Sequence, residues 1–108
     1  MKPILVYVDC RDTREAEDIG RELLEKKLVA CVNIIPSPIK SLYLWPPKSM
    51  FIEDAKEILL IAKTLDEKWD EIEKTVMKIH SYDVPGILAI PLTRVSRIYL
   101  AWMKKEIG

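Results

Sequence analysis

Short, almost wholly apolar runs alternate with amphipathic segments along the chain, and this alternation restricts it to folds that combine strands with helices. Ile4–Val8 contains only apolar residues, most of them β-branched or aromatic, which is typical of a strand buried on both faces. Pro91 lies within a later run and favours an edge strand or a bulge there. Further strands are predicted at residues 28–35, 39–45, 50–52, 57–64 and 86–92.

The first amphipathic segment follows the first strand. Asp12 lies three residues before Glu15, which is the spacing of a helix N-cap and its acidic partner. Apolar residues then recur at helical spacing as far as Leu24, and Lys26 and Lys27 are expected to close the last turn. The pattern predicts one helix between these two signals.

Two more helices are predicted further along the chain. Thr64 and Glu67 have the spacing of a capping box, and residues 69–79 carry one apolar stripe that steps by three and four positions. A last amphipathic segment over residues 95–102 predicts a C-terminal helix.

The resulting order is strand, helix, strand, strand, helix, strand, helix. Two strand–helix–strand units with right-handed crossovers give an α+β, ferredoxin-like βαββαβ sandwich. A hairpin extension over residues 39–52 and the C-terminal helix are additions to this plan. Because 108 residues is the length of one domain, we expect a single domain over residues 1–108.

Charge balance and hydropathy exclude several classes of protein. Seventeen Lys and Arg residues offset seventeen Asp and Glu residues, and a formal net charge of zero disfavours a nucleic-acid binder. No apolar run approaches the roughly 20 residues that span a membrane, and Met1–Pro3 leads into a strand without a signal peptide. We therefore expect a cytoplasmic protein with neither nucleic acid nor membrane as a partner.

No motif of an enzyme is recognisable in the chain. Gly20, Gly86 and Gly108 are too far apart to form a phosphate-binding loop. No feature of the sequence brings His80 to a Ser or Cys nucleophile. We expect no catalytic activity and no organic cofactor.

The nitrogen and sulfur donors for a metal ion are Cys10, Cys31 and His80, and their spacing matches no known ligand motif. Two cysteines are too few for a secreted disulfide framework, so both are expected to be free thiols. The apolar surroundings of Cys31 are more typical of a small buried hydrophobe than of a ligand. His80 ends the second predicted helix, where a capping role is favoured over metal ligation.

The segment His80–Gly86 supports two interpretations. As a connector, it ends a helix at Pro85 and uses Gly86 for an unusual backbone angle. As a pocket wall, it brings an imidazole, a phenol and a carboxylate together. The pattern alone does not decide between them.

Four aromatic residues need more cover than a domain of this size easily provides: Tyr43, Trp45, Tyr99 and Trp102. A long hairpin also leaves an unpaired strand edge. Pairing with another copy would cover both, and Tyr and Trp are enriched at such interfaces. We therefore expect a homo-oligomer, with packing inside one chain as the alternative.

Three parts of the chain together resemble the CutA family of divalent-cation tolerance proteins. They are Glu25–Ile34, Ser41–Trp45 with Glu57–Thr64, and His80–Pro85 with Tyr99–Trp102. The resemblance implies a trimer similar to the PII signalling proteins, with strands paired between subunits, and a role in tolerance of copper and other divalent ions. Carried over by position, the implied copper ligands are His80 and Cys31. The hairpin tip, Trp45-Pro46-Pro47-Lys48, departs from the family's pattern.

Three kinds of function follow from this resemblance. The leading one is a non-enzymatic homotrimer in the response to metal ions, with copper as the ion. The second is a PII-like module that binds a small anionic ligand or a partner protein in clefts between subunits, walled by Tyr82, Lys63 and Trp45. The third is a structural trimer that serves as a scaffold for other proteins.

Overall fold

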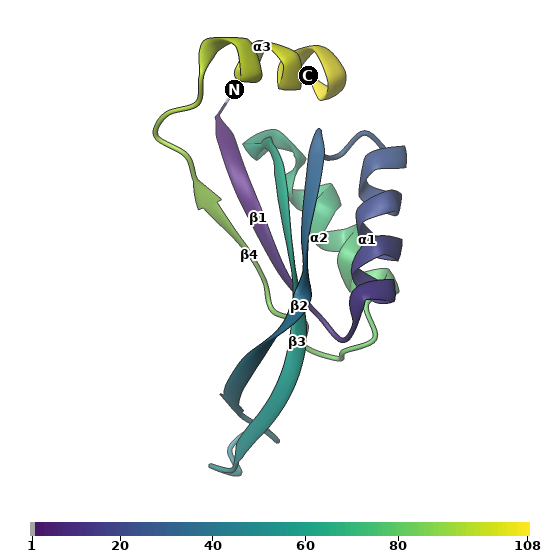
Figure 1. Ribbon diagram of the computed structural model, residues 1–108, viewed down its shortest axis with the longest axis vertical. Coiled ribbons are helices and arrows are strands. Elements are labelled where there is room, and N and C mark those ends of the chain that lie inside the picture. Colours follow the sequence, from purple (N-terminus) through teal and green to yellow (C-terminus); the bar gives the residue numbers. More distant parts are fainter. Residues whose placement is uncertain (1) are drawn as a thin grey trace.

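The computed structural model, which describes residues 2–108, contains one antiparallel sheet with the strand order β2-β3-β1-β4 (Figure 1). This order and the alternation of strands and helices confirm the predicted α+β, ferredoxin-like plan. The elements are β1 (Pro3–Cys10), α1 (Thr13–Glu25), β2 (Cys31–Leu44), β3 (Ile52–Leu65), the 3-10 turn η1 (Asp66–Lys68), α2 (Trp69–Ile79), β4 (Ile87–Pro91) and α3 (Arg97–Ile107).

Helices α1 and α2 cover one face of the sheet and form the main core with it (Figure 1). Because side chains alternate along a strand, Val6 and Val8 of β1 point toward the helices and are fully buried. Leu23 of α1 and Val76 of α2 pack against them from the helical layer. Helix α3 lies across one end of the sheet, where Met103 joins a second, smaller cluster.

The opposite face of the sheet, here called the uncovered face, has neither α1 nor α2 packed on it. The strand register places the following side chains there: Leu5, Tyr7, Asp9, Cys31, Asn33, Ile35, Glu57, Leu59, Ile61, Lys63, Leu88 and Ile90. Most of them are apolar. The prediction that Ile4–Val8 is buried on both faces is therefore correct on the helical side only, because Leu5 and Tyr7 on the uncovered face are half-buried.

The hairpin is longer and more continuous than predicted. Residues 28–35 and 39–45 were expected as two strands but contribute to one strand, β2, which begins at Cys31 and continues through an irregularity between Ile35 and Ile39. Pro36 and Pro38 do not end it, because they lie within this irregularity of an edge strand, where β2 has no paired residues in β3. Likewise, β3 is continuous from Ile52 through the predicted run 57–64, whereas the other two residues of the predicted run 50–52 lie outside it.

The first helix begins as predicted. The Asp12 carboxylate accepts a hydrogen bond from the backbone N–H of Glu15 at 2.8 Å, and thereby caps the N-terminus of α1. The end of the helix differs from the prediction, because Lys26 is the C-cap and Lys27 adopts a left-handed backbone angle of φ 56° beyond it. Neither lysine lies in the last turn.

The predicted capping box at Thr64 and Glu67 is wrong. Thr64 is fully buried in β3, where its hydroxyl donates a hydrogen bond to the carbonyl of Leu28 at 2.6 Å. Leu65 occupies the N-cap of η1, without a side-chain hydrogen bond. The Thr64 hydroxyl therefore bonds to the Leu28 carbonyl and does not cap the helix, contrary to the prediction from the sequence pattern. The edge position of β4, predicted from Pro91, is confirmed.

Within residues 2–108, no helix is both long and apolar enough to cross a membrane.

Substitution of Thr64 distinguishes its role in the sheet from a capping role. Thr64→Val should lower the free energy of unfolding by about 1 to 2 kcal/mol, because it leaves the buried Leu28 carbonyl without a donor. Thr64→Ser keeps the hydroxyl and is the control. Glu67→Ala, on an exposed residue, should change the free energy by less than about 0.5 kcal/mol. Guanidinium denaturation measures all three, and a larger loss for Glu67→Ala than for Thr64→Val would favour the capping box instead.

Candidate functional site

The structure places the sequence-predicted metal ligands Cys31 and His80 at different ends of the sheet. Cys31 pairs through Lys63 with Leu5 of β1, whereas the His80 ring lies against Asp9 at the other end of that strand. Four residues along a strand correspond to about 13 Å. The two ligands therefore do not share a site within one chain, and their binding of copper stays a prediction.

His80, the C-cap of α2, is held by two backbone groups. Its Nε2 lies 2.7 Å from the Asp9 carbonyl, and its Nδ1 accepts a hydrogen bond from the Tyr82 N–H at 3.0 Å. A carbonyl accepts and an amide donates, so these partners select the neutral tautomer with its proton on Nε2. The side chain is fully buried. A metal ion at either ring nitrogen would have to displace one of these bonds.

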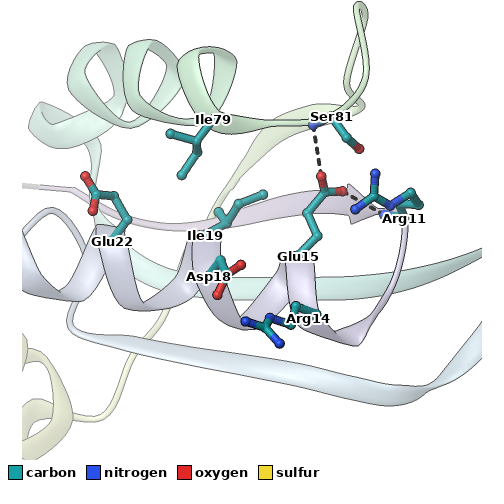
Figure 2. A pocket seen from close by; sticks show the side chains of 8 residues that line it. All are labelled: Arg11, Arg14, Glu15, Asp18, Ile19, Glu22, Ile79 and Ser81. Atoms are coloured by element: carbon teal, nitrogen blue, oxygen red, sulfur yellow. Dashed lines mark hydrogen bonds between the residues drawn. The ribbon is translucent and has the colours of Figure 1, made fainter.

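Glu15 connects the same region to the first helix. Its carboxylate accepts hydrogen bonds from the backbone N–H of Arg11 at 2.8 Å and from that of Ser81 at 2.9 Å (Figure 2). Burial alone would raise the pKa of Glu15, but the hydrogen bonds from Arg11 and Ser81 outweigh it and lower the pKa. One ionised carboxylate thus ties the β1–α1 turn to the α2–β4 connection.

Cys10, Glu15 and His80 form a buried cluster whose sulfur, oxygen and nitrogen atoms lie within 4.8 Å of one another. These donor types suit a borderline metal such as zinc or copper. However, both oxygens of Glu15 and both ring nitrogens of His80 already have backbone partners. Burial, followed by nearby carboxylates, also raises the pKa of the Cys10 thiol to about 12, so the thiol stays protonated. The cluster therefore fits a structural role better than a metal site.

The sequence analysis missed this cluster because its members are separated by five and by sixty-five positions. The Asp12–Glu15 pattern was recognised as a helix cap, but the second hydrogen bond of Glu15, to Ser81, depends on tertiary structure. The segment His80–Gly86 connects α2 to β4, as the connector interpretation predicted, but α2 already ends at Ile79 and Gly86 has no positive φ angle. The pocket-wall interpretation stays a prediction.

A polar cluster lies where the uncovered face meets the base of the hairpin. The Tyr82 ring packs against the His80 ring, with centroids 4.7 Å apart. Burial, and then a hydrogen bond to the Glu57 carboxylate, raises the pKa of the Tyr82 phenol. Burial, and then the charge of Glu57, also raises the pKa of Asp9. Asp9 and Glu57 are here called the acidic pair.

The other residues of the predicted cleft lie elsewhere in the chain. Lys63 is near α3, with its Nζ 5.6 Å from the centroid of the Tyr99 ring. Trp45 is at the hairpin tip, where its backbone N–H donates a hydrogen bond to the Phe51 carbonyl at 3.0 Å. Tyr82, Lys63 and Trp45 therefore do not line one cleft within a single chain, and a cleft that uses all three requires more than one copy.

A hollow of about 440 Å³ lies beside the N-terminal half of α1 (Figure 2). Arg11 and Arg14 supply positive charge to it, and Asp18 and Glu22 supply negative charge. Arg11 is also paired with Asp12, at 3.2 Å. Because the charges are mixed and Arg11 is already paired, the hollow favours neither an anion nor a cation.

The fold and the arrangement of these residues define a ferredoxin-like α+β protein with a long β-hairpin and an uncovered apolar sheet face. The sequence matches the CutA1 divalent ion tolerance protein family over residues 4–106, and the chain belongs to this family. The resemblance seen in the sequence is confirmed.

Relatives and solved structures of this family match over nearly the whole chain. The divalent-cation tolerance protein CutA of Archaeoglobus fulgidus is 43% identical over 94% of this chain and 95% of its own length. A solved structure from the same organism, named a periplasmic divalent cation tolerance protein, has a TM-score of 0.91 at 40% identity and covers 98% of this chain and 99% of that one. CutA1 from Oryza sativa has a TM-score of 0.92 at 32% identity, covering 100% and 95%.

Glu15→Gln tests the structural role of the buried carboxylate. At pH 7 the substitution should lower the free energy of unfolding by about 2 kcal/mol, because an amide group offers only one acceptor and sets a donor against a backbone N–H. Since the pKa of Glu15 is lowered by folding, its contribution is complete above the ordinary value of 4.5 and is lost as the pH falls through the folded value.

The difference in the free energy of unfolding between wild type and Glu15→Gln should therefore be constant above about pH 5 and should shrink on further acidification. Guanidinium denaturation as a function of pH measures this difference. Glu17→Gln, on the exposed side of the same helix, is the control. Equal loss in the two variants, or a difference that grows in acid, would contradict the proposed role.

Proposed function

We propose that the protein is a non-enzymatic homotrimer that takes part in the cytoplasmic response to divalent metal ions. Membership of the CutA family over residues 4–106 supports a relation to divalent cations. The relatives from Archaeoglobus fulgidus and Thermococcus kodakarensis are both named divalent-cation tolerance proteins. The cytoplasmic location remains a proposal, since one similar structure carries the name periplasmic.

The observation that supports assembly is the uncovered face. Leu88 and Ile90 of β4 and Ile35 of β2 are each more than two-fifths exposed in the single chain, next to half-buried Leu59 and Ile61. A contiguous apolar surface of this kind marks an interface. Three copies that turn these faces toward one another would cover them, in agreement with the trimer that the resemblance implies.

The hairpin adds a second apolar surface. Large side chains along its outer half are well exposed: Leu42, Tyr43, Leu44, Met50, Phe51 and Ile52. Its strand β2 also lies at the edge of the sheet, with free backbone groups on one side. A neighbouring copy would cover the side chains and pair with this edge. The hairpin therefore supports the same assembly as the uncovered face.

Copper is the ion that we propose for this response, with Cys31 and His80 as ligands. Cys31 is partly exposed on the uncovered face, and its thiol is a soft donor that suits Cu(I). His80 could offer a nitrogen only after one of its backbone hydrogen bonds opens. We therefore assign Cys31 the larger share of copper affinity.

A PII-like cleft for an anionic ligand is less well supported. Glu57 raises the pKa of the Tyr82 phenol and that of Asp9, so two carboxylates lie close to this phenol. These negative charges disfavour an anion at this end of the predicted cleft. The scaffold function has no specific support among the residues described.

Substitution of Leu88 tests the assembly. Leu88→Glu should dissociate the trimer, because it places a charge in the interface that the uncovered face would form. Leu24→Glu is the matched control, since Leu24 is 41% and Leu88 47% exposed but Leu24 lies on α1. Sedimentation should give about three times 12.5 kDa for wild type and for Leu24→Glu, and a smaller mass for Leu88→Glu.

The same variants test the function in cells made sensitive to copper. Wild type and Leu24→Glu should restore growth at raised copper concentration, and Leu88→Glu should not. A wild-type mass of 12.5 kDa would contradict the trimer, and growth that is unaffected by the wild-type protein would contradict the metal response.

A further inference from the structure

The acidic pair combines two carboxylates on one face of the sheet. Asp9 of β1 lies directly opposite Leu59 of β3, so Glu57 is its diagonal neighbour on the same face. Such neighbours are about 7 to 8 Å apart at the backbone, within reach of a long side chain. Glu57 is only 5% exposed, although it carries an acidic group.

The charge of the pair has no counter-ion within residues 2–108. The ion pairs there join other residues, and neither Asp9 nor Glu57 takes part in one. The Oδ1 atom of Asp9 is buried and has no hydrogen-bond partner in this part of the chain. An unpaired buried carboxylate oxygen is costly unless a cation binds to it.

The Asp9 carboxylate lies close to Gly86, in the segment that precedes β4. Its backbone N–H donates to the Gly86 carbonyl at 2.9 Å. A Cβ atom at position 86 would lie 2.5 Å from Oδ2 of Asp9, so only a glycine directly before β4 leaves room for the carboxylate in this position. On the other side, His80 orients the Tyr82 ring, whose phenol reaches Glu57.

We propose that Asp9 and Glu57 bind a hard divalent cation, such as Mg²⁺, Ca²⁺ or Mn²⁺, on the uncovered face. The site offers only oxygen donors, the preferred ligands of these ions and poor ones for Cu(I). It is distinct from Cys31, whose thiol lies at the other end of the sheet. The inference rests on the proposed function, because a second copy over the uncovered face would bury the pair further and strengthen the need for a cation.

Titration of the chelator-treated, assembled protein with Mn²⁺, followed by electron paramagnetic resonance, tests the site. Wild type should bind one Mn²⁺ per chain, and Asp9→Asn and Glu57→Gln should each weaken binding at least tenfold. Glu53→Gln, which removes an exposed carboxylate from the same strand, should bind as wild type does. Mn²⁺ should also raise the melting temperature of wild type but not that of Asp9→Asn. The melting transition of Asp9→Asn in the same measurement shows that this variant is folded.

Two results would overturn the proposal: no binding of Mn²⁺ to wild type, or equal binding of Mn²⁺ to wild type and to Asp9→Asn. A parallel Cu(I) titration of wild type and Cys31→Ser distinguishes a failure of the proposed cation site from a failure of the proposed function. Copper binding without Mn²⁺ binding would overturn only the proposed cation site at the acidic pair. If neither ion binds, the proposed response to metal ions would be overturned as well.

Discussion

The structure depends on burial of apolar side chains on both faces of a sheet that has helices on one face only. In β1, alternate residues point to opposite faces, so Val6 and Val8 enter the core while Leu5 and Tyr7 do not. The hydrophobic effect favours burial of both sets, and α1 and α2 satisfy only one. The remaining surface, continued by Leu88 and Ile90, is the physical reason to expect assembly.

A second constraint organises the end of the sheet where the proposed cation site lies. His80 and Glu15 make buried hydrogen bonds to backbone groups of β1, of the turn before α1 and of the α2–β4 connection. Since these bonds fix the position of Tyr82, they also fix the phenol that reaches Glu57. The residues that resemble metal ligands in the sequence thus connect the strands and helices at this end of the sheet.

Local patterns predicted the elements of the fold, and long-range contacts account for the differences. The strand Ile4–Val8 and the Asp12 cap depend on neighbours in the sequence and are confirmed. Thr64 was assigned to a helix because its partner, the Leu28 carbonyl, is thirty-six positions away. Residues 28–35 and 39–45 were predicted as two strands because the sequence did not show that both pair with β3 as parts of one edge strand. The acidic pair was missed for the same reason, since only the register of β1 with β3 makes Asp9 and Glu57 neighbours.

The central claim, that other copies cover the uncovered face in solution, is tested most directly by hydroxyl-radical footprinting of the native protein. Leu88, Ile90 and Leu24 are 47%, 46% and 41% exposed in the single chain, so a monomer would show similar oxidation at all three. The account predicts that Leu88 and Ile90 are oxidised at least several-fold more slowly than Leu24. Equal rates at the three positions, at a concentration well above that in a cell, would contradict it.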